Sequence, residues 1–202
     1  MWWCHTKERD YEHMYKQCRI EKSANRQREV ENQLAKMMEK QEFSKIRVCE
    51  LCEQIGMPRK SFYVYFDAKE DALQALIEHT ICDFDYYEAD ATDTSATYTF
   101  KVLKRFFEFW KEKDMVLNGL SKSGLSGILV TKIIEHTIKS EKSIPFMHWA
   151  DGKMLSETVL IYSVSGLMAI VLEWHRGGCK ESTGEMARKA TELLTSSYFK
   201  NV

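Results

Sequence analysis

Hydrophobic residues recur at helical spacing over about residues 25–41, the first clearly patterned part of the chain. The apolar positions stand at i, i+4, i+7 and i+8 and are Val30, Leu34, Met37 and Met38. Side chains at these intervals lie on one face of an α-helix. The pattern therefore predicts an amphipathic helix with one buried stripe.

Two shorter helices are predicted next, and a glycine separates them. The first covers residues 48–55 and has one apolar face, formed by Val48, Leu51, Cys52 and Ile55. Gly56 is expected to end it, because glycine adopts a positive φ without steric cost. The second is expected from about Pro58 to Tyr65, since proline at a first helical position loses no needed N–H. Phe62 and Phe66 are four apart and are expected to face the core.

A fourth helix is predicted from the start signal that follows. Asp67 is expected to be its N-cap, and Glu70, three residues on, to complete a capping box. The helix is expected to reach about Asp85 through the apolar residues Ala72, Leu73, Leu76, Ile77 and Ile81.

The polar stretch 86–99 is the clearest break in the pattern. Further helical patterns follow it at about 96–112, 115–121, 124–139, 153–177 and 182–198. One of them is apolar nearly all round over 156–174, whereas a helix on a monomer surface keeps a polar face. We expect one side of this helix to face its own core and another to face a second subunit, in a four-helix seam. The candidate interface residues are Val164, Leu167, Met168, Val171 and Leu193.

Composition supports an all-α protein. The 202 residues include only two prolines and nine glycines, which is unlike a many-stranded fold with tight turns. At 44% hydrophobic residues the chain can bury a sizeable core. The formal net charge is −1, so any binding to nucleic acid must come from a local basic patch.

The same composition predicts a cytoplasmic protein without a membrane partner. Six cysteines are too sparse for a disulfide scaffold, and the N-terminal residues lack the pattern of a signal peptide. The most apolar run, Val159–Leu172, has fourteen residues and is too short to span a bilayer.

The segment 47–65 combines a helix, a glycine turn and a second short helix, as a helix-turn-helix does. Outward positions of its second helix are Arg59, Lys60, Ser61, Tyr63 and Val64. Two cations at a helix start cost a few tenths of a kcal/mol against the helix dipole. Arginine can read guanine edges, and lysine, serine and tyrosine can hold phosphates, so a polyanion is the expected neighbour.

The stretch "IRVCELCEQIGMPRKSFYVYFDAKEDAL" resembles the DNA-binding module of the TetR family of bacterial transcriptional regulators. The matching positions are Cys52, Gly56, Ser61, Tyr63, Phe66 and Lys69. The resemblance covers about residues 25–77 specifically. More loosely, the C-terminal half is similar to a subgroup that includes relatives of dihydroxyacetone-kinase regulators.

The resemblance implies an all-α fold with an N-terminal three-helix DNA-binding module and a larger helical domain for ligand binding and dimerisation. The implied division is an extension at 1–23, the DNA-binding domain at 24–70 and the effector-binding and dimerisation domain at 71–202. A homodimer would bind palindromic double-stranded operator DNA, and an unknown small molecule would act as effector. Tyr63, Tyr65 and Lys69 would contact phosphates, while Arg59, Lys60 and Ser61 would lie nearest the base edges.

Two positions depart from the family pattern. Arg47 stands where a threonine often caps the first motif helix, so Glu50 is expected to lose its usual partner. Arg47 is expected to reach a phosphate instead. Pro58 replaces a serine and offers no hydroxyl.

Other candidate chemistry is weaker. The pair Cys49 and Cys52 leaves metal or thiol chemistry open, but zinc needs about four ligands and no second pair stands nearby. Cys52 also falls on the buried face, where cysteine acts as a small hydrophobe. The six histidines show no metal-binding spacing, and no catalytic motif appears, so neither a metal, a cofactor nor an enzyme is predicted.

Aromatic residues of the C-terminal half either line an effector pocket or form plain core. The pocket candidates are Phe106, Trp110, Trp149, Tyr162 and Trp174. The leading interpretation of the whole chain is a ligand-responsive repressor. The alternative is a TetR-like coactivator or adaptor that acts mainly through a protein partner, with the aromatic extension 1–23 as the feature that supports it.

Overall fold

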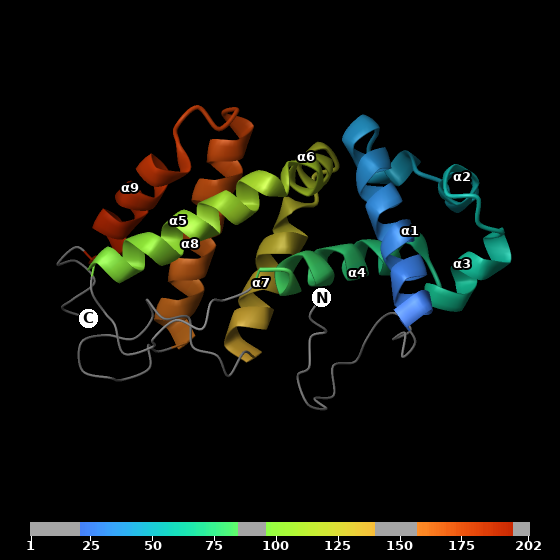
Figure 1. Cartoon of the computed structure of the whole chain (residues 1–202), viewed down its shortest axis with the longest axis horizontal. Coiled ribbons are helices and arrows are strands. Elements are labelled where there is room, and N and C mark those ends of the chain that lie inside the picture. Colours follow the sequence, from blue (N-terminus) through green and yellow to red (C-terminus); the bar gives the residue numbers. More distant parts are fainter. Residues whose placement is uncertain (1–20, 85–95, 140–156, 196–202) are drawn as a thin grey trace. The chain divides into compact units, whose positions relative to one another are not determined.

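The computed structural model describes residues 21–84, 96–139 and 157–195. Every regular element within these ranges is a helix, which confirms the predicted all-α class (Figure 1). In chain order they are α1 Glu21–Lys40, the 3-10 helix η1 Phe43–Lys45, α2 Val48–Gln54, α3 Arg59–Tyr65, α4 Lys69–Cys82, α5 Ala96–Glu112, α6 Asp114–Lys122, α7 Ser126–Lys139, α8 Glu157–Arg176 and α9 Thr183–Thr195. Most of the predicted extension 1–23 and the predicted pocket residue Trp149 lie outside the described residues.

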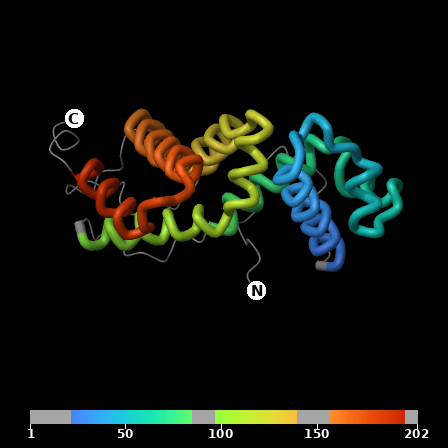
Figure 2. Tube along the Cα trace, turned by 90° about the horizontal axis from the view of Figure 1, so that it is seen from above, coloured from blue at the N-terminus to red at the C-terminus, as the bar shows by residue number. Residues whose placement is uncertain are grey.

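The chain divides into two compact units, whose helices can be followed along the trace in Figure 2. The N-terminal unit contains the described residues up to Asp83 together with Asn118–Leu125, and the C-terminal unit contains the remainder. The division thus runs through α6. The N-terminal unit extends beyond the predicted 24–70 module, because it includes α4 and the end of α6.

The predicted stripe of α1 is buried and forms the centre of the N-terminal unit, where α1 packs against α2 and α4. Val30 and Leu34 are fully buried, and Met37 and Met38 nearly so. A buried acid also joins α1 to α4. The Glu31 side chain is 1% exposed, and its Oε2 lies 2.8 Å from His79 Nδ1. The pairing satisfies a carboxylate that burial would otherwise penalise.

The start of α4 differs from the prediction by one residue. Ala68 is the N-cap, and alanine has no side-chain acceptor. Asp71 instead folds back, and its Oδ2 accepts the N–H groups of Asp67 at 2.9 Å and Ala68 at 3.0 Å. The predicted capping pair of Asp67 and Glu70 was therefore wrong, although the helix and its acidic first turn were found where expected.

The last residues of α6 hold the C-terminal end of α1. Lys122 Nζ donates to the carbonyl oxygens of Glu39 at 2.7 Å and Lys40 at 3.4 Å, which are among the carbonyls a helix end leaves unpaired. Gly119 permits the approach, because a Cβ at this position would lie 2.8 Å from Met38 Cβ. That distance is shorter than carbon atoms tolerate, and Met38 Cβ is fixed to the backbone of α1.

We expect Gly119→Ala to lower the free energy of unfolding by about 1–3 kcal/mol, the usual cost of overpacking a core. Gly127→Ala is the matched control, since a Cβ there meets nothing within 4 Å. That change should stabilise by about 0.4–1 kcal/mol through a less flexible unfolded chain. Urea denaturation of the full chain followed by circular dichroism measures both. Equal stability of the two variants would rule out the close approach of α6 to α1.

The core of the C-terminal unit contains a cluster of aromatic rings. Helix α5 runs beside α9 and also contacts α8, which packs on α7 (Figures 1 and 2). The ring of Phe107 meets Trp174 edge-on at 5.6 Å, and Phe84 lies 4.9 Å from Phe109. Such edge-on and tilted pairs stabilise beyond the area they bury.

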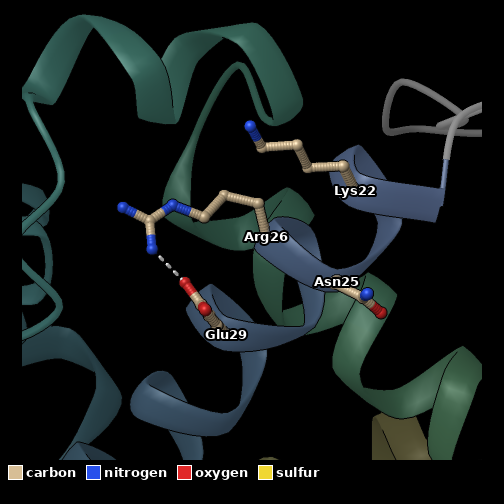
Figure 3. Close-up of a pocket in the computed structure, with 4 residues that line it drawn as sticks. All are labelled: Lys22, Asn25, Arg26 and Glu29. Atoms are coloured by element: carbon tan, nitrogen blue, oxygen red, sulfur yellow. Dashed lines mark hydrogen bonds and ion pairs between the residues drawn. The ribbon is translucent and has the colours of Figure 1, made fainter.

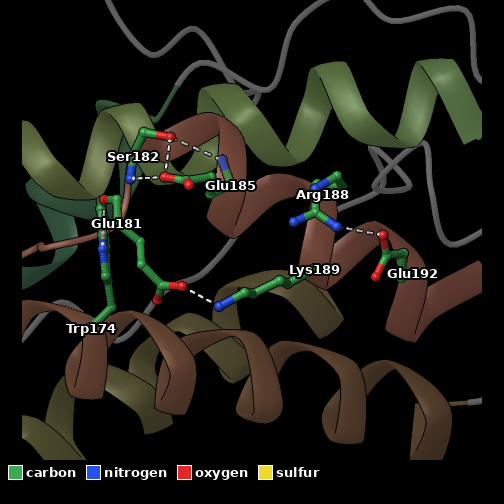
Figure 4. Close-up of polar contacts among 7 residues, drawn as sticks. All are labelled: Trp174, Glu181, Ser182, Glu185, Arg188, Lys189 and Glu192. Atoms are coloured by element: carbon green, nitrogen blue, oxygen red, sulfur yellow. Dashed lines mark hydrogen bonds and ion pairs between the residues drawn. The ribbon is translucent and has the colours of Figure 1, made fainter.

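A capping box starts α9 (Figure 4). Glu185 Oε2 accepts the N–H of Ser182 at 2.8 Å, and the Ser182 hydroxyl accepts the N–H of Glu185 at 3.2 Å. The bond from the Ser182 backbone, followed by that from its hydroxyl, lowers the pKa of Glu185. Beside it, Trp174 Nε1 donates to the Glu181 carbonyl at 3.1 Å and ties α8 to the turn before α9.

Among the described helices, α8 alone is long and apolar enough to cross a membrane, with 20 residues and a mean hydropathy of 1.4 over its most apolar window. The buried helix of a soluble protein meets the same criterion. One face of α8 is in fact buried in the C-terminal unit, through Ser163, Val164, Leu167, Met168, Val171 and Trp174.

Candidate nucleic-acid interface

The turn between α2 and α3 has the geometry that the glycine predicted. Gly56 has φ +59°, in the left-handed region, and a Cβ there would meet nothing within 4 Å. Backbone conformation, not space, is therefore what requires glycine. The N–H groups of Gly56 and Met57 bond back to the carbonyls of Glu53 at 3.2 Å and Cys52 at 2.9 Å. Met57 is 4% exposed and anchors the turn in the core.

Helix α3 has one buried and one exposed face. Phe62 and Phe66 are fully buried, with ring centroids 5.4 Å apart. On the other side Arg59 and Lys60 are exposed, Tyr63 is 37% exposed and Val64 60%. The two phenylalanines thus fix a helix whose opposite face consists of cations and an aromatic hydroxyl.

Arg59 is held by its own helix. Its Nη2 donates to the Tyr63 hydroxyl at 3.1 Å, and its guanidinium carbon lies 5.6 Å from the Tyr63 ring centroid. The hydrogen bond to Tyr63 and then the Coulombic interaction with it raise the pKa of Arg59. The side chain is therefore charged and partly ordered before any ligand arrives.

Arg47 stands at the N-cap of α2 without a side-chain cap bond, as predicted. Glu50 lacks the threonine cap, as expected, but it has another partner that was not predicted. Arg47 Nε donates to Glu50 Oε1 at 2.8 Å, and Nη2 bonds the same oxygen. This bond, followed by one from the Arg47 backbone N–H, lowers the pKa of Glu50. The Arg47 side chain remains 73% exposed and accessible to a ligand.

Lys69 has a different environment from the one expected for a phosphate contact. Its Nζ donates to the carbonyl oxygens of Phe43, Ser44 and Ile46 at 2.9, 3.1 and 2.9 Å. An ammonium has three donors, and all three are used. Lys69 also lies 4.6 Å from the Phe43 ring centroid. Its role in the structure is to hold η1 against the start of α4.

A hollow of about 480 Å³ collects several predicted residues on one surface. It brings Arg47, Arg59, Tyr63 and Lys69 together, whereas Lys60, Ser61 and Tyr65 lie outside it. The lining residues are Ile46, Arg47, Val48, Cys49, Arg59, Tyr63, Asp67, Ala68, Lys69 and Glu70.

Sequence reasoning missed a second hollow, of about 520 Å³, on the first turns of α1 (Figure 3). Lys22, Asn25, Arg26 and Glu29 line it, and Arg26 forms an ion pair with Glu29. Lys22 and Arg26 extend to the same side of the helix in Figure 3. Their four-residue spacing is the signal that could have found them, since it places two cations on one helix face.

The predicted pocket residues separate into two groups. Trp110 and Trp174 are 3% and 7% exposed, and both belong to the aromatic core, with Phe106 and Trp110 ring centroids 6.3 Å apart. Trp110 Nε1 is buried without a hydrogen-bond partner among the described residues. Tyr162, in contrast, is 64% exposed.

The predicted dimer residues also differ in their exposure to solvent. Val164, Leu167, Met168 and Val171 are at most 6% exposed and face the core of their own unit. Leu193 is 54% exposed. The side of α8 that is open carries Tyr162, Gly166 and Ala169 instead.

The cysteines of α2 are free thiols, with Cys49 half-buried and Cys52 buried. In the described part of the chain, no group of three or more histidine, cysteine, aspartate or glutamate side chains is placed to hold a metal ion.

The N-terminal unit thus has the architecture of a helix-turn-helix module, followed by a larger helical unit. The fold is similar to that in the crystal structure of a TetR-family transcriptional regulator from Streptomyces coelicolor. The TM-score is 0.53 at 15% sequence identity, over 85% of this chain and 79% of that chain. The resemblance expected from the sequence is therefore confirmed for the fold. No family model and no curated protein matches the sequence.

Proposed function

We propose that this protein is a ligand-responsive transcriptional repressor that acts in the cytoplasm and binds palindromic operator DNA as a homodimer. The observation that carries the proposal is the division of α3. Phe62 and Phe66 are buried and anchor this helix to the core. Its exposed face carries Arg59, Lys60 and Tyr63. An exposed helix with cations at its N-terminal end is the reading element of helix-turn-helix proteins. The similar fold of a transcriptional regulator supports it.

The geometry refines the proposed contacts. Arg59, Lys60 and Ser61 remain nearest the bases, and Tyr63, Tyr65 and Arg47 bind the phosphate backbone. Lys69 is withdrawn from this set, because its donors already bind three carbonyls. Lys22 and Arg26 on α1 are added as backbone contacts, since phosphate binding needs only accessible cations.

The dimer and effector proposals rest on the C-terminal unit. We place the subunit interface on the open side of α8 and on α9, with Tyr162, Gly166, Ala169 and Leu193 facing the partner. The aromatic cluster around Phe106 and Trp110 is the proposed effector region, because the unpartnered Trp110 Nε1 is a buried donor available to a ligand acceptor. The proposal contains no enzymatic step.

Binding to DNA is tested by fluorescence anisotropy, with palindromic duplexes selected from a random library. We expect the logarithm of the association constant to fall linearly with the logarithm of salt concentration, by about 0.9 per neutralised phosphate. A dimer engaging six to ten phosphates loses about a thousandfold or more between 50 and 200 mM salt. A full-length protein that enriches no duplex, even at low salt, would overturn the proposed function.

Lys69→Met and Lys60→Met form a matched pair that separates a structural lysine from a DNA contact. Lys69→Met should lower the free energy of unfolding by about 1.5–3 kcal/mol, because bonds to a charged group are lost. It should leave the salt slope of DNA binding unchanged. Lys60→Met should leave the free energy of unfolding nearly unchanged and weaken DNA binding, because it removes an exposed cation from the face nearest the bases. If Lys69→Met flattened the slope at unchanged stability, Lys69 would be a phosphate contact after all.

A further inference from the structure

Two thiols of α2 have no part in the proposed DNA contacts. Cys49 is half-buried and lines the hollow that also contains Arg47 and Arg59. Cys52, three residues on, is buried at 3% exposure. Both are free in the structure.

Helical geometry brings the two residues close to each other, although not to the distance of a disulfide. Positions i and i+3 of an α-helix have Cα atoms about 5 Å apart, from the rise, radius and rotation per residue. Disulfides accept Cα separations of roughly 4.4–6.8 Å. The Cβ atoms of such neighbours are about 5–6 Å apart, whereas a disulfide needs about 3.5–4.5 Å. The bond therefore requires the first turn of α2 to tighten by about 1–2 Å.

The charges around the pair distinguish its two members. The pKa of Arg59 is raised first by its hydrogen bond to Tyr63, and negative charge on Cys49 and Cys52 contributes in the same direction. The pKa of Arg47 is raised first by its hydrogen bond to Glu50, and negative charge on Cys49 contributes in the same direction. Cys49 is only half-buried and lines the same hollow as Arg47 and Arg59, so a peroxide that enters the hollow can reach its sulfur. Burial raises the pKa of Cys52, which keeps its proton until a partner sulfur is activated.

We propose that Cys49 and Cys52 are a peroxide-sensitive dithiol, and that their oxidation to a disulfide within α2 weakens DNA binding. The effect on DNA rests on the proposed function, whereas the thiol chemistry does not. The Cys49 thiolate attacks a hydroperoxide oxygen. An S–O bond forms, the O–O bond breaks, and the leaving oxygen takes a proton and departs as an alcohol, or as water from hydrogen peroxide.

The second step closes the disulfide. Cys52 loses its proton to solvent, and its sulfur attacks the sulfur of the Cys49 sulfenic acid. An S–S bond forms, the S–O bond breaks, and hydroxide leaves and takes a proton to become water. The balance is two thiols and one hydroperoxide giving one disulfide, one alcohol and one water.

The location of the pair explains why oxidation affects DNA. Arg47 is the N-cap of α2, and its carbonyl accepts the N–H of Leu51 at 3.1 Å. Tightening this turn moves Arg47 relative to Arg59 across the hollow. A displacement near 1 Å is enough to misalign charge-assisted hydrogen bonds, whose geometry is restrictive.

The test oxidises the purified full chain with one equivalent of hydrogen peroxide. Peptide mass mapping should find a Cys49–Cys52 disulfide, recognised by the loss of two hydrogens and its reversal by dithiothreitol. DNA affinity, compared between oxidised and reduced wild type, should fall at least tenfold and recover on reduction. Cys49→Ser and Cys52→Ala, each compared with its own reduced form, should form no disulfide and change less than twofold. Cys82→Ser, which removes an exposed thiol from α4, should respond as the wild type does.

Three results would overturn the proposal: Cys49 and Cys52 still reduced after treatment, a mapped disulfide with unchanged DNA affinity, or a tenfold loss in Cys52→Ala, which cannot form the bond. Mass mapping needs no DNA. If the reduced protein binds no duplex, the proposed function fails while the dithiol chemistry is still decided.

Discussion

Replacing Arg59 with alanine is expected to weaken binding of the selected duplex about tenfold to hundredfold, the usual loss for an arginine that bonds a base edge. The side chain stands at the start of α3, and its Nη2 is ordered by the Tyr63 hydroxyl at 3.1 Å. An arginine fork binds guanine O6 and N7 with two parallel bonds, which no alanine and no lysine reproduces. Anisotropy titrations at fixed salt measure the loss, and specificity should relax at one base position.

Two further variants define what Arg59 contributes. Tyr63→Phe keeps the ring and removes the hydroxyl that holds the guanidinium, so we expect a smaller loss than for Arg59→Ala. Arg176→Ala is the control, because Arg176 is 69% exposed on α8 and pairs with Glu173 of the same helix. It should bind DNA as the wild type does. Wild-type affinity in Arg59→Ala would mean that α3 is not the reading helix.

The largest effect on stability is expected for Phe62→Ala, at about 3–5 kcal/mol. The side chain is fully buried and contacts the rings of Phe66 and Tyr63, both at 5.4 Å. Its removal leaves a cavity beneath α3 as well as losing the transfer free energy of the ring. Folded domains are stable by only about 5–15 kcal/mol, so the change should remove a large fraction of the free energy of unfolding of the N-terminal unit.

Val64→Ala is the matched control for Phe62→Ala. Val64 lies on the same helix but is 60% exposed, and surface substitutions of this kind change stability by about 0.5 kcal/mol or less. Denaturant unfolding of the full chain, followed by circular dichroism, compares the two. Similar midpoints for the two variants would show that Phe62 does not anchor α3 to the core.

The amino-acid sequence was sufficient to predict the helices and the exposed face of the candidate site. The stripe from Val30 to Met38, the left-handed Gly56 and the pair Phe62 and Phe66 were all predicted and found. These features depend on the helical period and on turn-forming residues, and both are set by residues close together in the sequence. The ion pair of Arg47 with Glu50 is also a local feature. Its i, i+3 spacing can be seen in the sequence, although the pair itself was not predicted.

Contacts between residues far apart in the sequence became known from the three-dimensional fold. The family resemblance predicts a phosphate contact for Lys69, yet its donors reach carbonyls 23 to 26 residues earlier. Gly119 is needed because α6 passes so close to α1 that a Cβ at this position would lie 2.8 Å from Met38 Cβ, and no local pattern marks that approach. The apolar residues of α8 predicted a buried helix correctly, but whether each side met its own unit or remained open depended on where α5 and α7 lie. Period and propensity act over a few residues, whereas hydrogen-bond partners and close packing are set by the path of the whole chain.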